Sequence, residues 1–182
     1  MDTKVDAQLL HDHAELGDLL NRLTIAIDAD DVVQTHFSLD RFWARLAMHI
    51  RAEHLHLFPA ISRAASRLVS SHQTLPSEEP KKTIAQLRED HDFFMRELAE
   101  AVAITRGLLA NPDERTVAQL EVVNKKIAAV SSRLLKHNHI EETGIYRWCS
   151  TLLNEEERAE LASQVQKELD NLPPRFGGLD WS

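Results

Sequence analysis

Apolar residues recur every three or four positions along most of the chain, which is the spacing of amphipathic helices. A first helix is predicted over residues 5–27, with a stripe formed by Leu9, His13, Leu16, Leu20, Leu23 and Ile27. A second is predicted to begin near Ser38 as its N-cap, with the stripe Leu39, Phe42, Leu46, His49, Glu53 and Leu57. We expect Pro59 to end or kink that helix, and residues 61–69 to continue as a second helical piece.

Two more long helices follow a polar linker over residues 70–80. The third should start just after Pro80, with the stripe Ile84, Leu87, His91, Phe94, Leu98, Ala101 and then Ile104 or Thr105. Asn111 and Pro112 read as the N-cap and first position of the fourth, whose stripe is Leu120, Val123, Ile127, Val130, Leu134, His137, Glu141, Ile145 and Trp148. Asn154 should cap a shorter helix that ends near Leu169.

Long amphipathic helices with short connections and no strand pattern predict an all-α fold, an up-down-up-down four-helix bundle. We expect the bundle over residues 1–150, and a short C-terminal helix with an irregular tail over 151–182, packed on the bundle or trailing from it. A chain of 182 residues suits one domain with such an addition.

Composition narrows the function classes. The net charge of −8 argues against a nucleic-acid partner or an anionic membrane surface. The single cysteine, Cys149, can form no internal disulfide, and the charged N-terminal segment has no signal-peptide character. With no apolar stretch long enough to span a bilayer, we expect a soluble cytoplasmic protein in a reducing compartment.

Six metal-ligand side chains interrupt the four apolar stripes: His13, His49, Glu53, His91, His137 and Glu141. His49–Glu53 and His137–Glu141 share a four-residue spacing, which places each pair on one helix face. Polar groups at core positions are unfavourable unless they find partners. In a bundle of alternating direction all six positions fall towards the same end, so we expect one buried polar cluster that binds metal.

Imidazole and carboxylate ligands suit first-row metals such as iron, manganese or zinc, and without thiolates the site cannot hold an iron–sulfur cluster. Two Glu are enough to bridge a pair of ions, which leaves two His for each and open positions for O2, NO or peroxide. The sequences of the second and fourth helices also resemble each other. When they are aligned, Glu53 corresponds to Glu141 and Phe58 to Tyr146, the kind of internal symmetry that a two-metal site would use.

The ordered set resembles the hemerythrin-like, His-His-Glu cation-binding family over about residues 5–148. The residues that carry it are His11-Asp-His13-Ala-Glu-Leu16, His49-Ile-Arg-Ala-Glu53 with Leu57-Phe58-Pro59, Glu89-Asp-His91-Asp, and His137-x-x-x-Glu141-Glu142 with Ile145-Tyr146. The resemblance implies a non-haem, carboxylate-bridged di-iron site in a four-helix bundle.

Two departures from the oxygen-carrying members change what the resemblance implies. Those proteins have a second His four residues after the helix-three His, where this chain has Met95. They also have an Asp five residues after the helix-four His, where this chain has Glu142. One iron would then be less saturated, which favours sensing, peroxide chemistry or NO handling over reversible oxygen carriage. His54 and Glu142 are alternatives for the missing ligand, although neither lies on a core stripe.

The remaining histidines have plainer interpretations. His11, His54, His56 and His139 fall off the stripes and read as surface residues or as neighbours of the ligands, with His54 and His56 the candidates for additional ligands beside Glu53. His36 and His72 are expected in loops. Tyr146 either packs in the core or donates to a bound oxygen species.

Four functions remain open at this point. The first is a di-iron protein that binds or responds to O2, NO or peroxide in oxidative or nitrosative stress. The second is an enzyme that removes peroxide or reduces NO. The third is an iron donor or store resembling proteins that repair iron centres, although the N-terminal Cys-containing region typical of those is not seen here. The fourth is a structural bundle that binds nothing. A sensor would need a protein contact or an oligomer change, such as a homodimer, for its output, and the sequence does not identify the partner.

Overall fold

The fold is all-helical, as the periodicity predicts. The computed structural model describes residues 4–70, 78–111 and 116–176. Its elements in chain order are α1 (Lys4–Asp28), α2 (Val32–Ala52), η1 (Glu53–Leu57), α3 (Phe58–Ser70), α4 (Glu78–Ala110), α5 (Thr116–Ile140), η2 (Glu141–Ile145), α6 (Tyr146–Leu152), α7 (Glu155–Leu169) and η3 (Pro174–Phe176).

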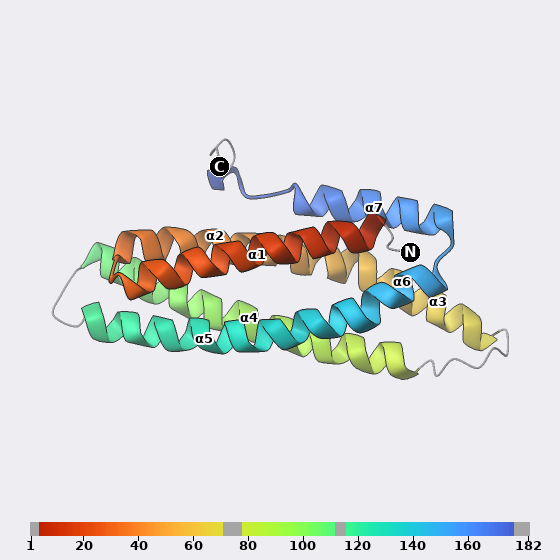
Figure 1. Ribbon diagram of the computed structural model, residues 1–182, viewed down its shortest axis with the longest axis horizontal. Helices are drawn as coiled ribbons and strands as arrows, with labels where there is room; N and C mark the ends of the chain where they lie inside the picture. Colours follow the sequence, from red (N-terminus) through yellow and green to blue (C-terminus); the bar gives the residue numbers. More distant parts are fainter. Residues whose placement is uncertain (1–3, 71–77, 112–115, 177–182) are drawn as a thin grey trace.

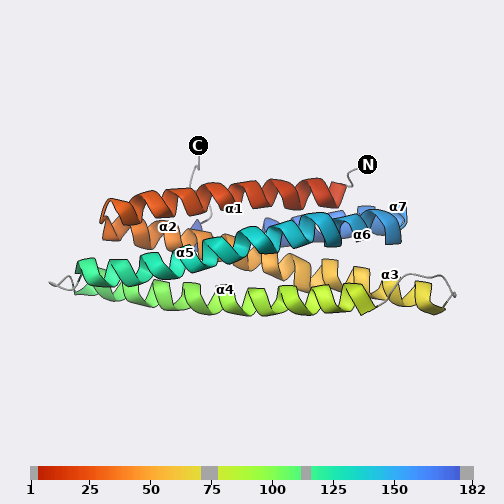
Figure 2. The ribbon, with the colours of Figure 1, turned by 60° about the horizontal axis from the view of Figure 1, so that its bottom comes forward.

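The long helices α1, α2, α4 and α5 lie side by side along the molecule (Figures 1 and 2). α1 packs against α2, α4 packs against α5, and α2–α4 and α1–α5 contacts close the bundle. α7 lies beside α1 and α2 and contacts both of them (Figure 1). Asn154 caps α7 through a reciprocal capping box with Glu157, so the predicted short helix from Asn154 to Leu169 is confirmed.

Two predicted helix starts are wrong. α2 begins at Val32 rather than near Ser38, because Asp31 is the N-cap and its side chain accepts from the Gln34 N–H at 2.9 Å. The apolar periodicity does not predict its first turns, because they have no continuous apolar stripe and their Val33 is exposed. α4 begins at Glu78, so Pro80 lies in its first turn. Backbone N–H groups of a first turn have no intrahelical acceptor, so a proline there breaks no hydrogen bond of the helix. Pro112, the predicted first position of the fourth helix, lies outside the described residues, as do His72 and most of the C-terminal tail.

We expected Pro59 either to end or to kink its helix, and it does not end it. The chain passes from α2 through η1 into α3, and η1 is a π-helical turn in which the Phe58 N–H bonds to the Glu53 carbonyl five residues back. The wider turn makes room for a proline ring that would clash with the carbonyl four residues earlier in a regular α-helix. η2 has the same form, with the Tyr146 N–H bonded to the Glu141 carbonyl.

A polar layer divides the hydrophobic core. One apolar cluster contains Leu9, Leu57, Leu87 and Ile145, and the other begins beyond the layer with Leu16, Leu46, Phe94 and Leu134. On each of the four long helix runs the predicted ligand residues lie between these two sets. Each cluster shields the layer from solvent on one side, which makes unpaired polar groups there unfavourable.

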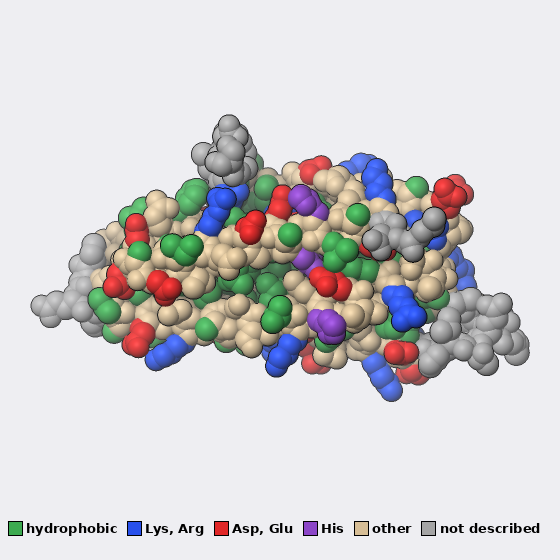
Figure 3. Space-filling model, in the orientation of Figure 1, with side chains coloured by type: hydrophobic (Ala, Val, Ile, Leu, Met, Phe, Trp, Pro, Cys, Tyr) green, Lys and Arg blue, Asp and Glu red, His purple; other side chains and the backbone are tan. Residues whose placement is uncertain are grey.

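The surface carries charges of both signs. On the face drawn in Figure 3, acidic and basic side chains of the described residues are interspersed. Among the described helices, none combines the length and the apolar character needed to cross a bilayer.

Candidate metal centre

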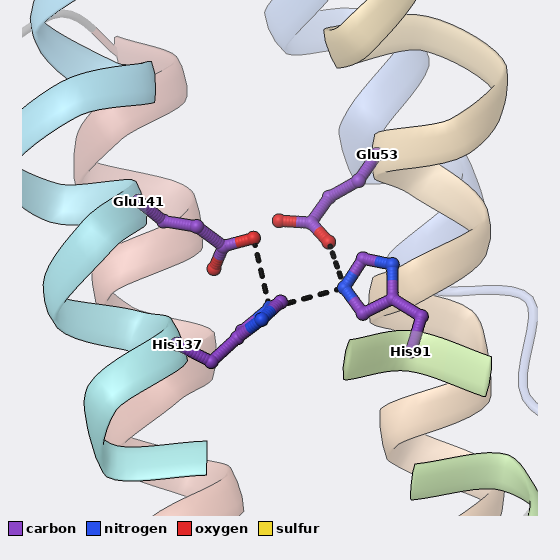
Figure 4. A group of neighbouring side chains, drawn as sticks. All are labelled: Glu53, His91, His137 and Glu141. Atoms are coloured by element: carbon purple, nitrogen blue, oxygen red, sulfur yellow. Dashed lines mark hydrogen bonds and ion pairs between the residues drawn. The ribbon is translucent and has the colours of Figure 1, made fainter. Parts of the chain in front are cut away.

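The structure brings all six predicted residues into the polar layer, and each of them is buried. Figure 4 shows four of them pointing toward one another from three helical runs. Ligand atoms from Glu53, His91, His137 and Glu141 lie within 4.8 Å of one another, and so do those from His13, His49 and Glu141. The six side chains therefore form two adjoining groups that share a carboxylate.

Each glutamate faces one histidine with each of its oxygens. The Oε1 of Glu53 lies 3.3 Å from His49 Nε2, and its Oε2 lies 3.2 Å from His91 Nε2. The Oε1 of Glu141 lies 3.0 Å from His137 Nε2, and its Oε2 lies 3.3 Å from His13 Nε2. Both carboxylates thus have the placement of a bridge between a His13/His49 position and a His91/His137 position.

The buried carboxylate oxygens lack well-directed hydrogen bonds. Glu53 and Glu141 are both fully buried, yet none of their four side-chain oxygens has a hydrogen-bond partner of acceptable geometry among the described residues. The Nε2 atoms of His91 and His137 also face each other at 3.0 Å. Four carboxylate lone-pair donors and four imidazole nitrogens aimed at one buried space are what a pair of first-row cations requires, so the residues fit such ions.

The other nitrogen of each imidazole is held by a separate partner. His49 Nδ1 bonds to Asp12 at 2.7 Å and His137 Nδ1 to Asp90 at 3.2 Å. Carboxylates only accept, so these Nδ1 atoms carry the proton and leave the Nε2 lone pairs free for a cation. His13 Nδ1 pairs with Glu142 at 3.0 Å, and His91 Nδ1 with His54 at 2.8 Å.

These partners repeat across the two halves of the bundle. Asp12 and Asp90 each stand one residue before a cluster histidine, and each bonds to the histidine of another helix. An arginine four residues before that histidine, Arg45 or Arg133, pairs with the same aspartate. The partners of the remaining two histidines, His54 and Glu142, each follow a glutamate of the cluster by one residue.

The charges of this layer favour bound positive charge. Burial alone would lower the pKa of His49, but the nearby charge of Glu53 and the hydrogen bond with Asp12 hold this pKa well above its usual value. Burial alone would raise the pKa of Glu53, yet His49 and His91 hold it well below its usual value. The pKa of His137 is raised by Glu141 against the effect of burial. Cations that bind here take the place of these protons.

A family model described as the hemerythrin HHE cation-binding domain matches residues 5–149. The chain belongs to this hemerythrin family. The match confirms the resemblance seen in the sequence and spans every residue of the two groups. No curated protein and no solved structure showed significant similarity to the chain.

The two halves of this hemerythrin domain differ at one pair of corresponding positions, Phe58 and Tyr146. The hydroxyl of Tyr146 lies 3.1 Å from His13 Nε2, whereas the corresponding Phe58 stacks on the ring of His91, with centroids 5.9 Å apart. Tyr146 is buried, and burial together with the nearby carboxylates raises its pKa well above the usual value. The His13/His49 half therefore has a polar wall, and the His91/His137 half has an aromatic one.

The residues considered as extra ligands lie outside the two groups. Glu142 and His54 reach the Nδ1 side of His13 and His91 rather than the shared space. His56 lies 3.4 Å from Glu168 of α7, away from the centre. Met95 is half-buried and packs against the apolar cluster. His11 is exposed beside Glu15.

One other histidine prediction is corrected. His36 lies within α2 rather than in a loop, because α2 starts earlier than expected, and its ring bonds to Thr105 Oγ1 at 2.8 Å. His139 is exposed at the end of α5.

Sequence reasoning missed four residues that position the clustered histidines: Asp12, Asp90, Arg45 and Arg133. Their signal was present as a repeated Arg-x-x-x-His-x-x-x-Glu pattern, Arg45–Glu53 and Arg133–Glu141, and as an aspartate just before His13 and His91. The periodicity of a single helix cannot show these pairings, because each aspartate bonds across to a different helix.

Proposed function

We propose that this hemerythrin-domain protein binds two iron ions in its core and binds or responds to O2, NO or peroxide there. The observation that carries the proposal is the pair of buried glutamates whose four oxygens each face a different imidazole Nε2. His13 and His49 would hold one ion, His91 and His137 the other, and Glu53 and Glu141 would bridge them. Iron bound in this way supplies redox and ligand-binding chemistry to the core.

Side chains beside His13 favour the binding of a small ligand on the His13/His49 side of the cluster. A surface hollow of about 420 Å³ is lined by residues that include Glu142 and Tyr146, both of which contact His13. The hollow gives a small molecule a short approach to the cluster, and the Tyr146 hydroxyl can donate a hydrogen bond to a ligand beside His13. The described walls near His91, formed by Phe58 and Phe94, are apolar.

The proposal includes the arrangement of the chain. We take the long helices to run alternately up and down, as the chain direction in Figures 1 and 2 supports. We also take residues 1–150 as the metal-binding bundle and 151–182 as an addition, which agrees with a family match that ends at residue 149.

The direct test is to remove both bridges. The double variant Glu53→Ala with Glu141→Ala should lose bound iron and the visible band that we expect from the native protein on oxidation, because no other carboxylate joins the two groups among the described residues. A matched double variant of surface glutamates, Glu97→Ala with Glu100→Ala, should keep both. Iron retained in full by the bridge variant would refute the proposal.

A peroxide-removing or NO-reducing enzyme is the second candidate, and Met95 is the observation that favours it. The oxygen-carrying members have a second histidine four residues after the helix-three histidine. Here the apolar Met95 takes its place, which would leave one ion with an open position. Turnover of peroxide or NO no faster than that of free iron would exclude this candidate.

A further inference from the structure

The guanidinium of Arg45 connects the metal centre to α7. Arg45 lies on α2, and its Nη2 contacts Asp12 and also Glu15, the latter at 2.7 Å. Its Nη1 donates to the carbonyl oxygen of Leu169, the last residue of α7, at 2.8 Å. Since Asp12 accepts from His49 at 2.7 Å, three consecutive contacts join the end of α7 to a predicted ligand.

A second contact joins the same end of α7 to η1. Glu168 Oε2 forms an ion pair with Arg51 Nε at 2.7 Å, and its other oxygen lies 3.4 Å from His56 Nε2. His56 belongs to η1, the π-helical turn that starts with the bridging Glu53. Val165 and Leu169 of α7 pack in the apolar cluster that borders the site. α7 therefore contacts the helix that carries His49 and Glu53 both before His49, at Arg45, and after Glu53, at His56.

The other half of the bundle has the same arginine without this connection to α7. Arg133 pairs with Asp90 at 2.5 Å, as Arg45 pairs with Asp12. Its guanidinium lies over the ring of Phe93 on α4, 4.5 Å from the ring centre. Arg133 thus provides an internal comparison, because it holds a ligand histidine in the same way but faces a different neighbour.

We propose that α7 is thermodynamically coupled to the metal centre through Arg45, so that cation binding stabilises the docked end of α7 and a docked α7 strengthens cation binding. The inference rests on the proposed function, since it takes His49 as a ligand. A long side chain loses rotamer entropy when it is fixed. Asp12 and the Leu169 carbonyl share one guanidinium, so fixing it from either side lowers the entropic cost for the other.

The terminal carbonyls of a helix lack intrahelical donors, and a cation at that end is favourable. The last turn of α7 therefore depends on Arg45 more than its capped first turn does. By linkage the coupling acts in both directions with equal magnitude. Loss of the docked state would uncover Leu161, Val165 and Leu169, an apolar face whose exposure would then depend on cation occupancy.

Hydrogen exchange of the full-length protein tests this coupling. Amides of α7 and of the ligand-bearing helices are followed by mass spectrometry, with and without Fe(II) under anaerobic conditions, and bound iron is measured in each sample. We expect Fe(II) to slow exchange in the last turns of α7 by about tenfold, a typical coupling magnitude. Arg45→Met should remove most of that protection while amides around His91 stay protected, and Arg133→Met should leave the α7 effect in place.

A second pair of variants keeps the test decisive if Arg45→Met does not fold. Glu168→Gln removes the charge that pairs with Arg51 and lies beside His56, and should reduce the Fe(II) effect on α7. Glu157→Gln weakens an ion pair with Arg67 at the opposite end of the same helix, and should not. Iron bound with site amides protected and α7 unchanged would overturn the coupling and leave the proposed function standing. A native protein that binds no iron would overturn both.

Discussion

Asp12 and Asp90 show how single residues prepare the site. Each is buried and holds the Nδ1 proton of a histidine on another helix, and each is itself paired with an arginine. Burial by itself raises the pKa of Asp12, but His49 and Arg45 together hold it below the usual value, so it stays charged. A charged partner fixes the ring orientation and makes the imidazole a better ligand.

Replacing one of these aspartates should weaken metal binding without removing a ligand. We expect Asp90→Asn to lower iron affinity by about 10- to 100-fold, the usual effect of losing such a partner, because a neutral amide polarises His137 less. Affinity is measured by competition with a chelator. Asp92→Asn, on the exposed face of the same helix, is the control and should leave affinity unchanged. Equal affinities in the two variants would contradict this role of Asp90.

Tyr146 gives a second prediction at the residue scale. If its hydroxyl donates to a ligand beside His13, Tyr146→Phe should weaken azide binding to the iron-loaded protein by about tenfold, the effect of one hydrogen bond to a charged group. Optical titration with azide measures this, and iron content is checked in parallel. Thr143→Val, which removes another hydroxyl lining the same hollow, should bind azide normally. An unchanged azide affinity in Tyr146→Phe would show that the hydroxyl does not reach the ligand.

The six clustered residues could be predicted from sequence because each interrupts an apolar stripe. Their orientation could not be predicted, since it depends on residues such as Asp12 that lie beside the stripe and bond across helices. Glu142 was weighed as a ligand, and only the structure shows that it faces the Nδ1 side of His13 instead.

At the scale of elements, Glu53 and Glu141 each open a π-helical turn. Such a turn holds one more residue than an α-turn and often lies at a functional site. Here η1 and η2 stand at equivalent positions of the two halves and carry Glu53 and Glu141 into the shared space. Sequence periodicity indicated continuing helices but gave no sign of the extra residue, because the apolar stripe resumes on the far side of each turn.

Removing the extra residue should separate folding from metal binding. Deletion of Thr143, which is exposed in η2, should convert this turn to a regular α-helix and change the placement of Glu141 relative to the following helix. No proline follows η2, so we expect the helical content by circular dichroism to be retained and the iron content to fall. Thr143→Ala keeps the length of the turn and is the control. Full iron loading of the deletion variant would show that the π-helical turn is not needed.

The start of α2 illustrates a different limit of sequence analysis. Its first turns contain the exposed Phe37 and the buried Thr35, so the apolar pattern there does not indicate a core-facing helix. The local capping signal of Asp31 was the better guide. Helices whose ends project beyond the core are set by caps more than by periodicity.

For the whole molecule, the buried charges predict how cation binding depends on pH. The raised pKa values of His49 and His137 mean that their protons stabilise the cation-free protein at low pH, and that this contribution is lost as pH rises through the raised values. Cations must displace those protons. The iron-induced rise in Tm should therefore be larger near about pH 8 than near about pH 6, a range in which histidines commonly titrate.

Thermal unfolding at the two pH values, with and without Fe(II), measures this effect. The double variant Glu53→Gln with Glu141→Gln should show no iron-induced rise at either pH. A rise in the native protein that is larger at the lower pH would contradict the account, since it would mean that proton release does not accompany cation binding.

Anaerobic titration with Fe(II), followed by elemental analysis and an optical spectrum before and after exposure to air, tests the central claim most directly. We predict tight binding that saturates at two irons per chain, and a near-ultraviolet and visible band that appears with oxidation. Saturation at one iron or none, or the same loading in the Glu53→Gln, Glu141→Gln double variant, would contradict a carboxylate-bridged pair of ions in this core.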